Sequence, residues 1–243
     1  MHGTPWVLID TETDGIDYPI HVVELAGQLM HGWEPVGPPF QMLLNHDVPI
    51  SARVSAIHGY TREHLRRHGH PPAAVYEAFR AYAGDLPLVA HNLAFDWDRV
   101  LRPEWARLNI APVGRRGFCC LMTARRLALE SRRMGLGYLK AHYALTDSLG
   151  HRALNDVLTM VELFSRVYRP RLESAGLTTF DAVARFTART PVASCTDLIR
   201  RALSGDTGNI PSTARRVPSG SGYGVRVPVP EVASAAVAAG LNS

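Results

Sequence analysis

The sequence predicts an α/β protein in which helices flank a mixed sheet. Two patterns indicate this: three strand-like apolar runs come first, and helical patterns then alternate with short strands. The composition agrees, because 46% of the 243 residues are hydrophobic and only 20% are charged, which excludes a wholly disordered chain. At about 100–200 residues per domain, this length predicts one large domain or one domain with an appendage.

Each strand is expected where a short apolar run is bounded by turn residues. The expected strands are residues 6–9, 22–30, 40–45, 86–90 and 118–122. Helices are expected where apolar residues recur at helical spacing: residues 51–57, a helix capped by Thr61, 72–82, 95–108 with an interruption at Pro103, 123–130, 137–143 and 153–173. The run at residues 6–9 is predicted to be the buried central strand, and the next two are predicted to follow it in a meander.

The composition changes after residue 176. Residues 178–189 are expected to form one more helix, and residues 204–230 are rich in Gly, Pro and Ser. We expect an extended tail there, with a hairpin as an option, followed by an alanine-rich helix candidate at 231–240. The predicted division is therefore a domain at residues 1–173 and a C-terminal helix and tail at residues 174–243.

Membrane and secreted classes are not expected. No apolar run approaches the roughly 20 residues that a membrane span needs. The N-terminus lacks a basic region, and polar residues 10–14 fall where the apolar part of a signal peptide would run. We therefore expect a cytoplasmic protein without a membrane partner.

Cysteine and histidine give no clear zinc motif. Cys119, Cys120 and Cys195 form no C-x-x-C pair and no even-numbered disulfide framework, so reduced and mostly buried thiols are expected. His64 and His68 stand four apart on a predicted helix and are able in principle to bind zinc. Because no acidic or cysteine residue accompanies them, a solvated helix face is the preferred interpretation.

The basic residues are almost all arginine. The formal charge is +4, and Lys140 is the only lysine among 26 basic residues. Arginine binds phosphate with two parallel hydrogen bonds and would suit a nucleic-acid partner. Codon composition explains the same skew, and we favour that explanation.

Carboxylates follow two of the predicted strands. Asp10 and Glu12 are two apart, so they share one face of the sheet and repel each other unless a cation lies between them. Asp96 follows the fourth strand, at the edge where open α/β sheets bind ligands. A helix turns about 200° in two residues, so Asp98 cannot face the same site. Stabilisation of the first helical turn remains an alternative role for Asp96.

A histidine and an aspartate begin the long helix near residue 153. Five residues rotate a helix by about 140°, so His151 and Asp156 converge only if His151 precedes the regular helix. Gly150 makes such a break plausible. A structural histidine is the alternative interpretation, since the chain contains 11 histidines.

Three motifs together resemble a known family. Asp10-Thr-Glu-Thr-Asp-Gly15, His91-Asn-Leu-Ala-Phe-Asp96 and His151-x4-Asp156 resemble, in order and spacing, the motifs of the DnaQ-like, DEDDh-type 3′–5′ exonucleases. Ala56-Ile-His-Gly-Tyr-Thr61 is similar to the His-Gly element of that family. The resemblance spans about residues 7–168 and implies a ribonuclease H-like fold with a five-stranded mixed sheet. Arg152 stands where the sister subtype has tyrosine, which favours the histidine subtype.

The resemblance also implies a mechanism. Four clustered carboxylates suit hard divalent cations, and all-oxygen ligands favour Mg²⁺ or Mn²⁺ over zinc. By resemblance, Asp10 bridges two metals, Glu12 and Asp156 hold the first, and Asp96 supports the site partly through water. His151 is implied to take a proton from the attacking water. The products would be nucleoside 5′-monophosphates.

Five further residues match positions near the substrate. Thr13, Ile57 and His58 correspond to positions that approach the terminal nucleotide in the family. A core role for Ile57 and a turn role for His58 are equally favoured. Asn92 and Phe95 match the second motif, where we expect them to orient the loop and pack beneath it.

The expected substrate is the 3′ end of single-stranded DNA. An RNA-trimming relative is the alternative within the enzyme class, and a subunit that docks to a polymerase through its tail is the alternative outside it. Gln28 and Gln41 are the only glutamines and both fall in the predicted fold, so the tail contains no glutamine-led sliding-clamp motif. A catalytically inactive binding module is disfavoured because all five site residues are present.

Overall fold

The computed structural model describes residues 3–127, 129–146 and 151–192, together with residues 195, 199, 203 and 204. These residues belong to one compact unit, residues 1–208. The predicted tail and terminal helix at residues 205–243 lie outside the described residues. None of the described helices is both long and apolar enough to cross a bilayer.

The described strands form one mixed sheet. They are β1 (Pro5–Thr13), β2 (Val22–His31), β3 (Glu34–Pro35), β4 (Phe40–Leu43), β5 (Pro87–Ala90) and β6 (Arg115–Cys119). The order is β3-β2-β1-β5-β6, and β4 also pairs with β2. β1 is antiparallel to β2 and parallel to β5, which is parallel to β6. The sheet has six strands where we expected five, because the two-residue β3 pairs with the end of β2 that β4 leaves free.

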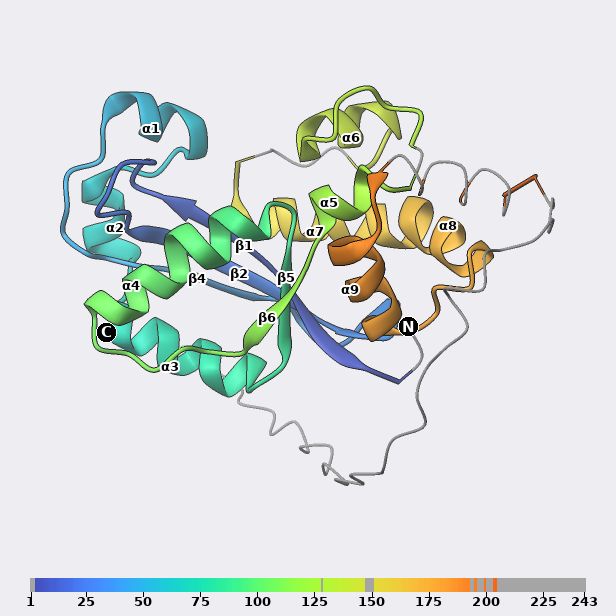
Figure 1. Ribbon diagram of the computed structural model, residues 1–243. Helices are drawn as coiled ribbons and strands as arrows, with labels where there is room; N and C mark the ends of the chain where they lie inside the picture. The colour runs from blue at the N-terminus through green and yellow to red at the C-terminus, as the bar shows by residue number, and fades with distance from the viewer. Residues whose placement is uncertain are drawn as a thin grey trace. The chain divides into compact units, whose positions relative to one another are not determined.

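Helices cover both faces of the sheet (Figure 1). They are α1 (Ala52–His58), α2 (Arg62–His68), α3 (Pro72–Ala83), η1 (Ala94–Leu101), α4 (Arg102–Arg107), α5 (Cys120–Ala124), α6 (Leu136–His142), α7 (Ala153–Leu163), η2 (Phe164–Tyr168), α8 (Arg169–Ser174) and α9 (Phe180–Arg189). α7 packs on β1 and β2, and α9 packs on β6. The predicted α/β architecture with flanking helices is confirmed.

The alternation along β1 determines where its carboxylates point. Trp6 and Leu8 are buried in the core that contains the residues of α7, α8 and α9. Val7 and Ile9 are buried in the opposite core, with residues of α3, η1 and α4. Since successive strand residues alternate between faces, Asp10 continues the series that faces α7.

Two of the expected helices are divided next to a proline. Residues 95–108 form the π-helix η1 and then α4, in which Pro103 lies in the first turn. Pro103 has no N–H to donate to the carbonyl of Arg99, and that oxygen instead accepts the hydroxyl of Tyr18 at 2.7 Å. Residues 153–173 divide in the same way at Pro170 into α7, η2 and α8. The interruption at Pro103 was expected, and the one at Pro170 was not.

The last strand begins earlier than predicted. We expected residues 118–122 to form it, but β6 is Arg115–Cys119 and α5 follows at once. Gly117 explains part of the difference, because a Cβ there would lie 2.5 Å from the carbonyl oxygen of Leu88 on β5. The close approach of the two strands therefore requires glycine. The two arginines of β6 are exposed at the sheet edge, so the first half of this strand lacks the apolar residues by which strands are predicted.

The chain after residue 173 contributes to the same core. Thr179 caps α9 by accepting the N–H of Ala182 at 3.2 Å. Phe180, Val183 and Phe186 are buried beside Trp6 and Phe118. The domain boundary at residue 173 stays a prediction.

Candidate active site

Four carboxylates converge at the carboxyl ends of β1 and β5. Asp10 and Glu12 lie on β1, and Asp96 lies in the first turn of η1, the next element after β5. Asp156 lies in the first turn of α7. Glu12, His151 and Asp156 each offer one ligand atom, and these three atoms lie within 4.8 Å of one another.

Burial and mutual repulsion perturb these carboxyl groups. Burial raises the pKa of Asp10 well above its usual range, and the charges of Asp96 and Asp156 raise it further. The pKa of Glu12 is raised to about 8, chiefly by burial and then by Asp156 and Glu24. Burial raises the pKa of Asp96 to about 7 and also raises that of Asp156. The protein alone therefore resists four negative charges here, and a divalent cation would relieve the repulsion.

Asp96 is held in place by β1. The hydroxyl of Thr11 donates to its carboxylate at 2.7 Å, from the strand position between Asp10 and Glu12. At the start of η1, the carbonyl of Asn92 accepts the N–H groups of Phe95 and Asp96. Asn92 is exposed, whereas Phe95 is partly buried against the core beneath the loop. Both residues thus belong to the turn that leads into Asp96.

The neighbouring Asp98 faces away from this cluster. Its carboxylate accepts a hydrogen bond from Arg116 at 3.1 Å and lies 3.9 Å from Arg102. Its side chain is 38% exposed, whereas Asp96 is 4% exposed. The helical rotation expected from the sequence therefore separates the two aspartates. Asp98 offers a matched control for Asp96.

His151 precedes α7 in a left-handed conformation. Its φ is +60°, and the first residue of α7 is Ala153. This break in the helix brings the exposed imidazole beside Glu12 and Asp156, as the rotation argument requires. Residues 147–150, including the glycine that we expected to allow the break, lie outside the described residues.

Glu24 is a fifth carboxylate that the motifs did not include. It lies directly opposite Glu12 in the β1–β2 pair and is fully buried. Its carboxylate accepts the amide of Gln41 at 2.6 Å and the N–H of Ala153 at 2.9 Å. Glu24 therefore fixes the beginning of α7. A signal was available in the sequence, since Glu24 is the one charged residue in the apolar run 22–30.

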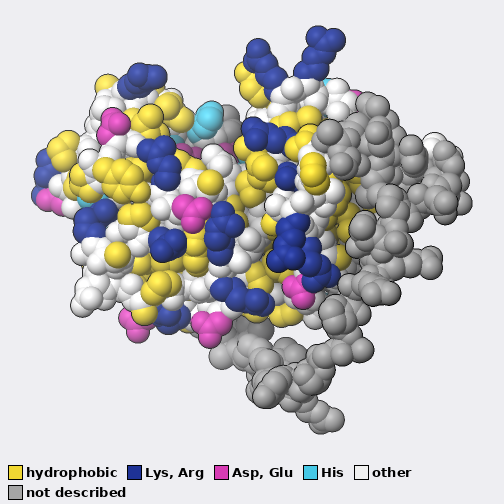
Figure 2. All heavy atoms as spheres, in the orientation of Figure 1, with side chains coloured by type: hydrophobic (Ala, Val, Ile, Leu, Met, Phe, Trp, Pro, Cys, Tyr) yellow, Lys and Arg dark blue, Asp and Glu magenta, His cyan; other side chains and the backbone are white. Residues whose placement is uncertain are grey.

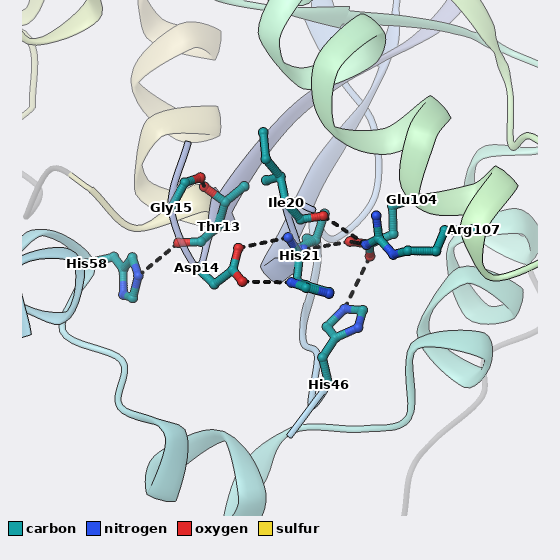
Figure 3. Close-up of polar contacts among 10 residues, drawn as sticks. Thr13, Asp14, Gly15, Ile20, His21, His46, His58, Glu104 and Arg107 are labelled. Atoms are coloured by element: carbon teal, nitrogen blue, oxygen red, sulfur yellow. Dashed lines mark hydrogen bonds and ion pairs between the residues drawn. The ribbon is translucent and has the colours of Figure 1, made fainter. Parts of the chain in front are cut away.

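His58 holds the end of β1 through a hydrogen bond to the backbone. Its Nδ1 accepts the N–H of Tyr60 at 3.0 Å, so the proton lies on Nε2, which donates to the carbonyl of Thr13 at 3.2 Å (Figure 3). Burial lowers the pKa of His58, which favours this neutral form. Thr13 is also buried, and Ile57 is 50% exposed. Ile57 is thus not a core residue, and a substrate contact remains open to it.

The segment that follows Glu12 is tied down by two acidic residues. Asp14 accepts the N–H and the Nδ1 of His21, at 2.8 and 2.7 Å (Figure 3). Glu104 on α4 is fully buried and accepts the N–H of Val22 at 2.9 Å. Arg107 lies 3.2 Å from the same carboxylate. These contacts fix the turn between β1 and β2, and with it the end of β1.

The carboxylate cluster, the adjoining histidine and the mixed sheet define a nuclease-like class of protein. A family model described as "RNase_T: Exonuclease" matches residues 7–164, so the chain belongs to this exonuclease family. A DNA polymerase III subunit epsilon-like protein of Rhodobacter capsulatus is 31% identical over 192 residues, which cover 73% of this chain and 25% of that protein. A PolC-type DNA polymerase III of Streptococcus pyogenes is 27% identical over 178 residues, 73% of this chain and 12% of that protein. The chain spans a quarter or less of the length of these relatives.

Solved structures agree with this family. E. coli exonuclease I in complex with a dT13 oligonucleotide superposes with a TM-score of 0.62 at 18% identity, covering 70% of this chain and 42% of that one. Exonuclease X in complex with 5′ overhanging duplex DNA gives a TM-score of 0.57 at 26% identity, covering 75% of this chain and 99% of that one. The first likeness concerns the fold alone. The ribonuclease H-like fold expected from the sequence is confirmed.

Proposed function

We propose that this protein hydrolyses nucleic-acid 3′ ends, with single-stranded DNA as the preferred substrate, and releases nucleoside 5′-monophosphates. One observation carries the proposal: the convergence of Asp10, Glu12, Asp96 and Asp156 with His151 at one edge of the sheet. Such a cluster is costly in the empty protein and is well matched to cations and phosphodiesters. Water attacks the terminal phosphorus, and the bond to the 3′ oxygen of the preceding nucleotide breaks.

The donor set fits two divalent cations. Mg²⁺ and Mn²⁺ prefer carboxylate oxygens, and the raised pKa values of Glu12 and Asp96 mark groups whose charge a cation would stabilise. Bound cations would supply stabilisation of the charge that develops on the phosphate. In our assignment Asp10, Glu12 and Asp156 would hold the cations, and Asp96 would support the site.

His151 is proposed to accept the proton of the attacking water. Its imidazole is exposed and lies beside Glu12 and Asp156, so it reaches the same region as the carboxylates without being buried among them. Imidazole exchanges protons near neutral pH, which suits a general base. Thr13, Ile57, His58, Asn92 and Phe95 are proposed to shape the place of the terminal nucleotide, directly or through the loops that they hold.

The names of the relatives favour DNA over RNA. DNA polymerase III proteins are the relatives described above, and two similar structures contain DNA. An RNA-trimming activity remains the second candidate because the same cluster would hydrolyse either backbone. Docking to a polymerase through the C-terminal tail is proposed as the partner interaction, and the tail lies outside the described residues.

A substrate panel tests the proposal. Single-stranded DNA, duplex DNA, mismatched duplex and RNA would each be labelled at the 5′ or the 3′ end and incubated with Mg²⁺, Mn²⁺ or EDTA. The proposal predicts immediate release of a 3′ label as a mononucleotide and gradual shortening of 5′-labelled strands, fastest for single-stranded DNA. Internal cleavage, or shortening from the 5′ end only, would refute it.

A further inference from the structure

A pocket of about 320 Å³ lies between β4, α2 and the residue before α7. Planar and basic side chains dominate its wall: Tyr60, His64, His68, His70 and Arg152, with Gln41 at the edge strand. No acidic side chain is among the described residues that line it. Figure 2 shows one face of the molecule with Lys and Arg spread among other side chains. Net charge alone therefore does not locate a phosphate site, and the composition of this pocket is more informative.

Arg152 is held in this pocket by its neighbours. Its guanidinium carbon lies 4.1 Å from the centroid of the Tyr60 ring, a close cation–π contact. Gly59 leaves the necessary space, because a Cβ there would lie 3.0 Å from Nη2 of Arg152, and its φ of +78° favours glycine. Among the described residues Arg152 forms no ion pair within 4 Å, unlike Arg62 and Arg67 on α2, although its charge lowers the pKa of Glu12. Its guanidinium is thus held in place by Tyr60 and Gly59, without a close ion pair among the described residues that would compete with a phosphate.

Two histidines extend the row of rings that begins at Tyr60, each tilted against the next. The ring centroids of Tyr60 and His64 are 5.5 Å apart, and those of His64 and His68 are 4.6 Å apart. Burial lowers the pKa of His64, and the positive charges of His68 and Arg152 lower it further. His64 therefore favours its neutral form, whose ring N–H is able to donate to a phosphate, and Arg152 supplies the fixed positive charge of the pocket.

We propose that this pocket is a phosphate-binding subsite, which holds a backbone phosphate of the substrate strand upstream of the reacting 3′ end. The inference rests on the proposed exonuclease function. Arg152 directly follows His151 in the chain, and Glu24 links Gln41 of the pocket to the first residue of α7. The volume is at the lower end of the ~300–1,000 Å³ of small-molecule sites, which suits one nucleotide unit rather than a protein segment.

A metal is a poorer occupant of the pocket. A metal site of three or more protein ligands requires them to lie close together, and among the described residues only Glu12, His151 and Asp156 meet that condition. The guanidinium of Arg152 would also repel a cation in this pocket. The zinc option that the sequence left for His64 and His68 is therefore less consistent with the structure than an anion.

Direct binding tests the subsite independently of hydrolysis. The full chain would be titrated into 5′-labelled dT12 with Ca²⁺ in place of Mg²⁺, and the Kd would be measured by fluorescence anisotropy at several salt concentrations. We expect Arg152→Gln to raise the Kd about tenfold, which corresponds to the loss of one charge-assisted contact. The slope of log Kd against log salt concentration should fall by about the contribution of one phosphate contact. Arg152→Lys should recover part of the affinity, and His68→Ala should weaken binding at a position more remote from the carboxylates.

Arg67→Gln is the matched control, since Arg67 lies on the same helix but pairs with Glu63 at 2.6 Å. Its Kd should stay within about twofold of wild type, as for a surface ion pair. Equal binding by the wild type, Arg152→Gln and His68→Ala would overturn the subsite, as would an equal loss in Arg67→Gln. A parallel titration with inorganic phosphate at constant ionic strength distinguishes free phosphate from a backbone phosphate of the strand. If the wild type binds inorganic phosphate tightly and the variants bind dT12 as well as the wild type does, the assignment to the strand is overturned. If the wild type binds dT12 but does not degrade DNA, the exonuclease proposal fails while the binding result stands.

Discussion

Glu24 of β2 lies directly opposite Glu12 of β1, and the two carboxylates have different partners. Glu24 is buried and accepts hydrogen bonds from Gln41 and Ala153, whereas Glu12 lies with His151 and Asp156. One of the two paired acids thus holds the helix that carries Asp156, and the other belongs to the candidate metal cluster. Position in the sheet alone does not separate the two roles, but the hydrogen-bond partners do.

Glu24→Ala should therefore destabilise the protein. It leaves the buried N–H of Ala153 without its acceptor and should lower the free energy of unfolding by about 1–3 kcal/mol. Glu24→Gln should retain most of the stability, because the oxygen of the new amide would still accept the N–H of Ala153. The side-chain amide of Gln41 would rotate so that its oxygen accepts an N–H of that new amide. Urea denaturation measures both variants. Equal losses in the two would show that the charge of Glu24, rather than its hydrogen bonds, stabilises the fold.

Asp96 and Asp98 provide a paired test of the site. Asp96→Asn should reduce Mg²⁺-dependent release of a 3′ label by about 100-fold or more, since it removes a charge from the cluster. Asp98→Asn should stay within about twofold of wild type, because Asp98 lies at the surface with Arg116. The rates would be measured on single-stranded DNA at saturating Mg²⁺. Similar losses in both variants would contradict the assignment.

His151→Ala should reduce the rate by about 10²–10⁴-fold if His151 is the general base. The stabilisation of the protein by Mn²⁺ should persist, because the carboxylates remain. His31→Ala, at an exposed position at the end of β2, is the control and should leave the rate unchanged. A rate for His151→Ala within a few-fold of wild type would exclude the general-base role.

The carboxylate cluster predicts how stability depends on pH. The folded-state pKa values of Glu12 (about 8) and Asp96 (about 7) lie above the usual carboxyl value near 4. Between about pH 4 and pH 8 the folded state therefore binds more protons than the unfolded state, so the metal-free protein loses stability as the pH rises. Mn²⁺ replaces those protons, and its effect on Tm should grow from about pH 6 to about pH 8. Scanning calorimetry with Mn²⁺ or EDTA tests this, and a metal-free Tm that rises over the same range would contradict it.

Local rules predicted much of the fold. The period-two alternation of a strand places Asp10 and Glu12 on one face of β1. The rotation of a helix correctly separates Asp96 from Asp98. The break before α7 at His151 was expected on the condition that His151 and Asp156 converge, since a regular helix would rotate them apart. These predictions depend on short stretches of chain, in which geometry constrains the side chains directly.

Long-range contacts explain what the sequence did not reveal. Glu24 and Ala153 are 129 residues apart, and no local pattern indicates that they meet. Arg152 was noted only as a departure from the tyrosine subtype, although its contact with Tyr60 builds the basic pocket. Strand β6 was displaced because its arginines lie at the sheet edge and carry no apolar signal. Such features depend on how distant segments pack against each other.

The central claim is tested most directly by comparing the wild type with Asp10→Asn on a 3′-labelled single-stranded oligonucleotide. We predict that the wild type with Mg²⁺ releases nucleoside 5′-monophosphates, that EDTA stops the release, and that Asp10→Asn releases none. Circular dichroism should show the same fold in both proteins. Degradation by Asp10→Asn at the wild-type rate, with Mg²⁺ still required, would contradict the claim that this carboxylate cluster is the active site.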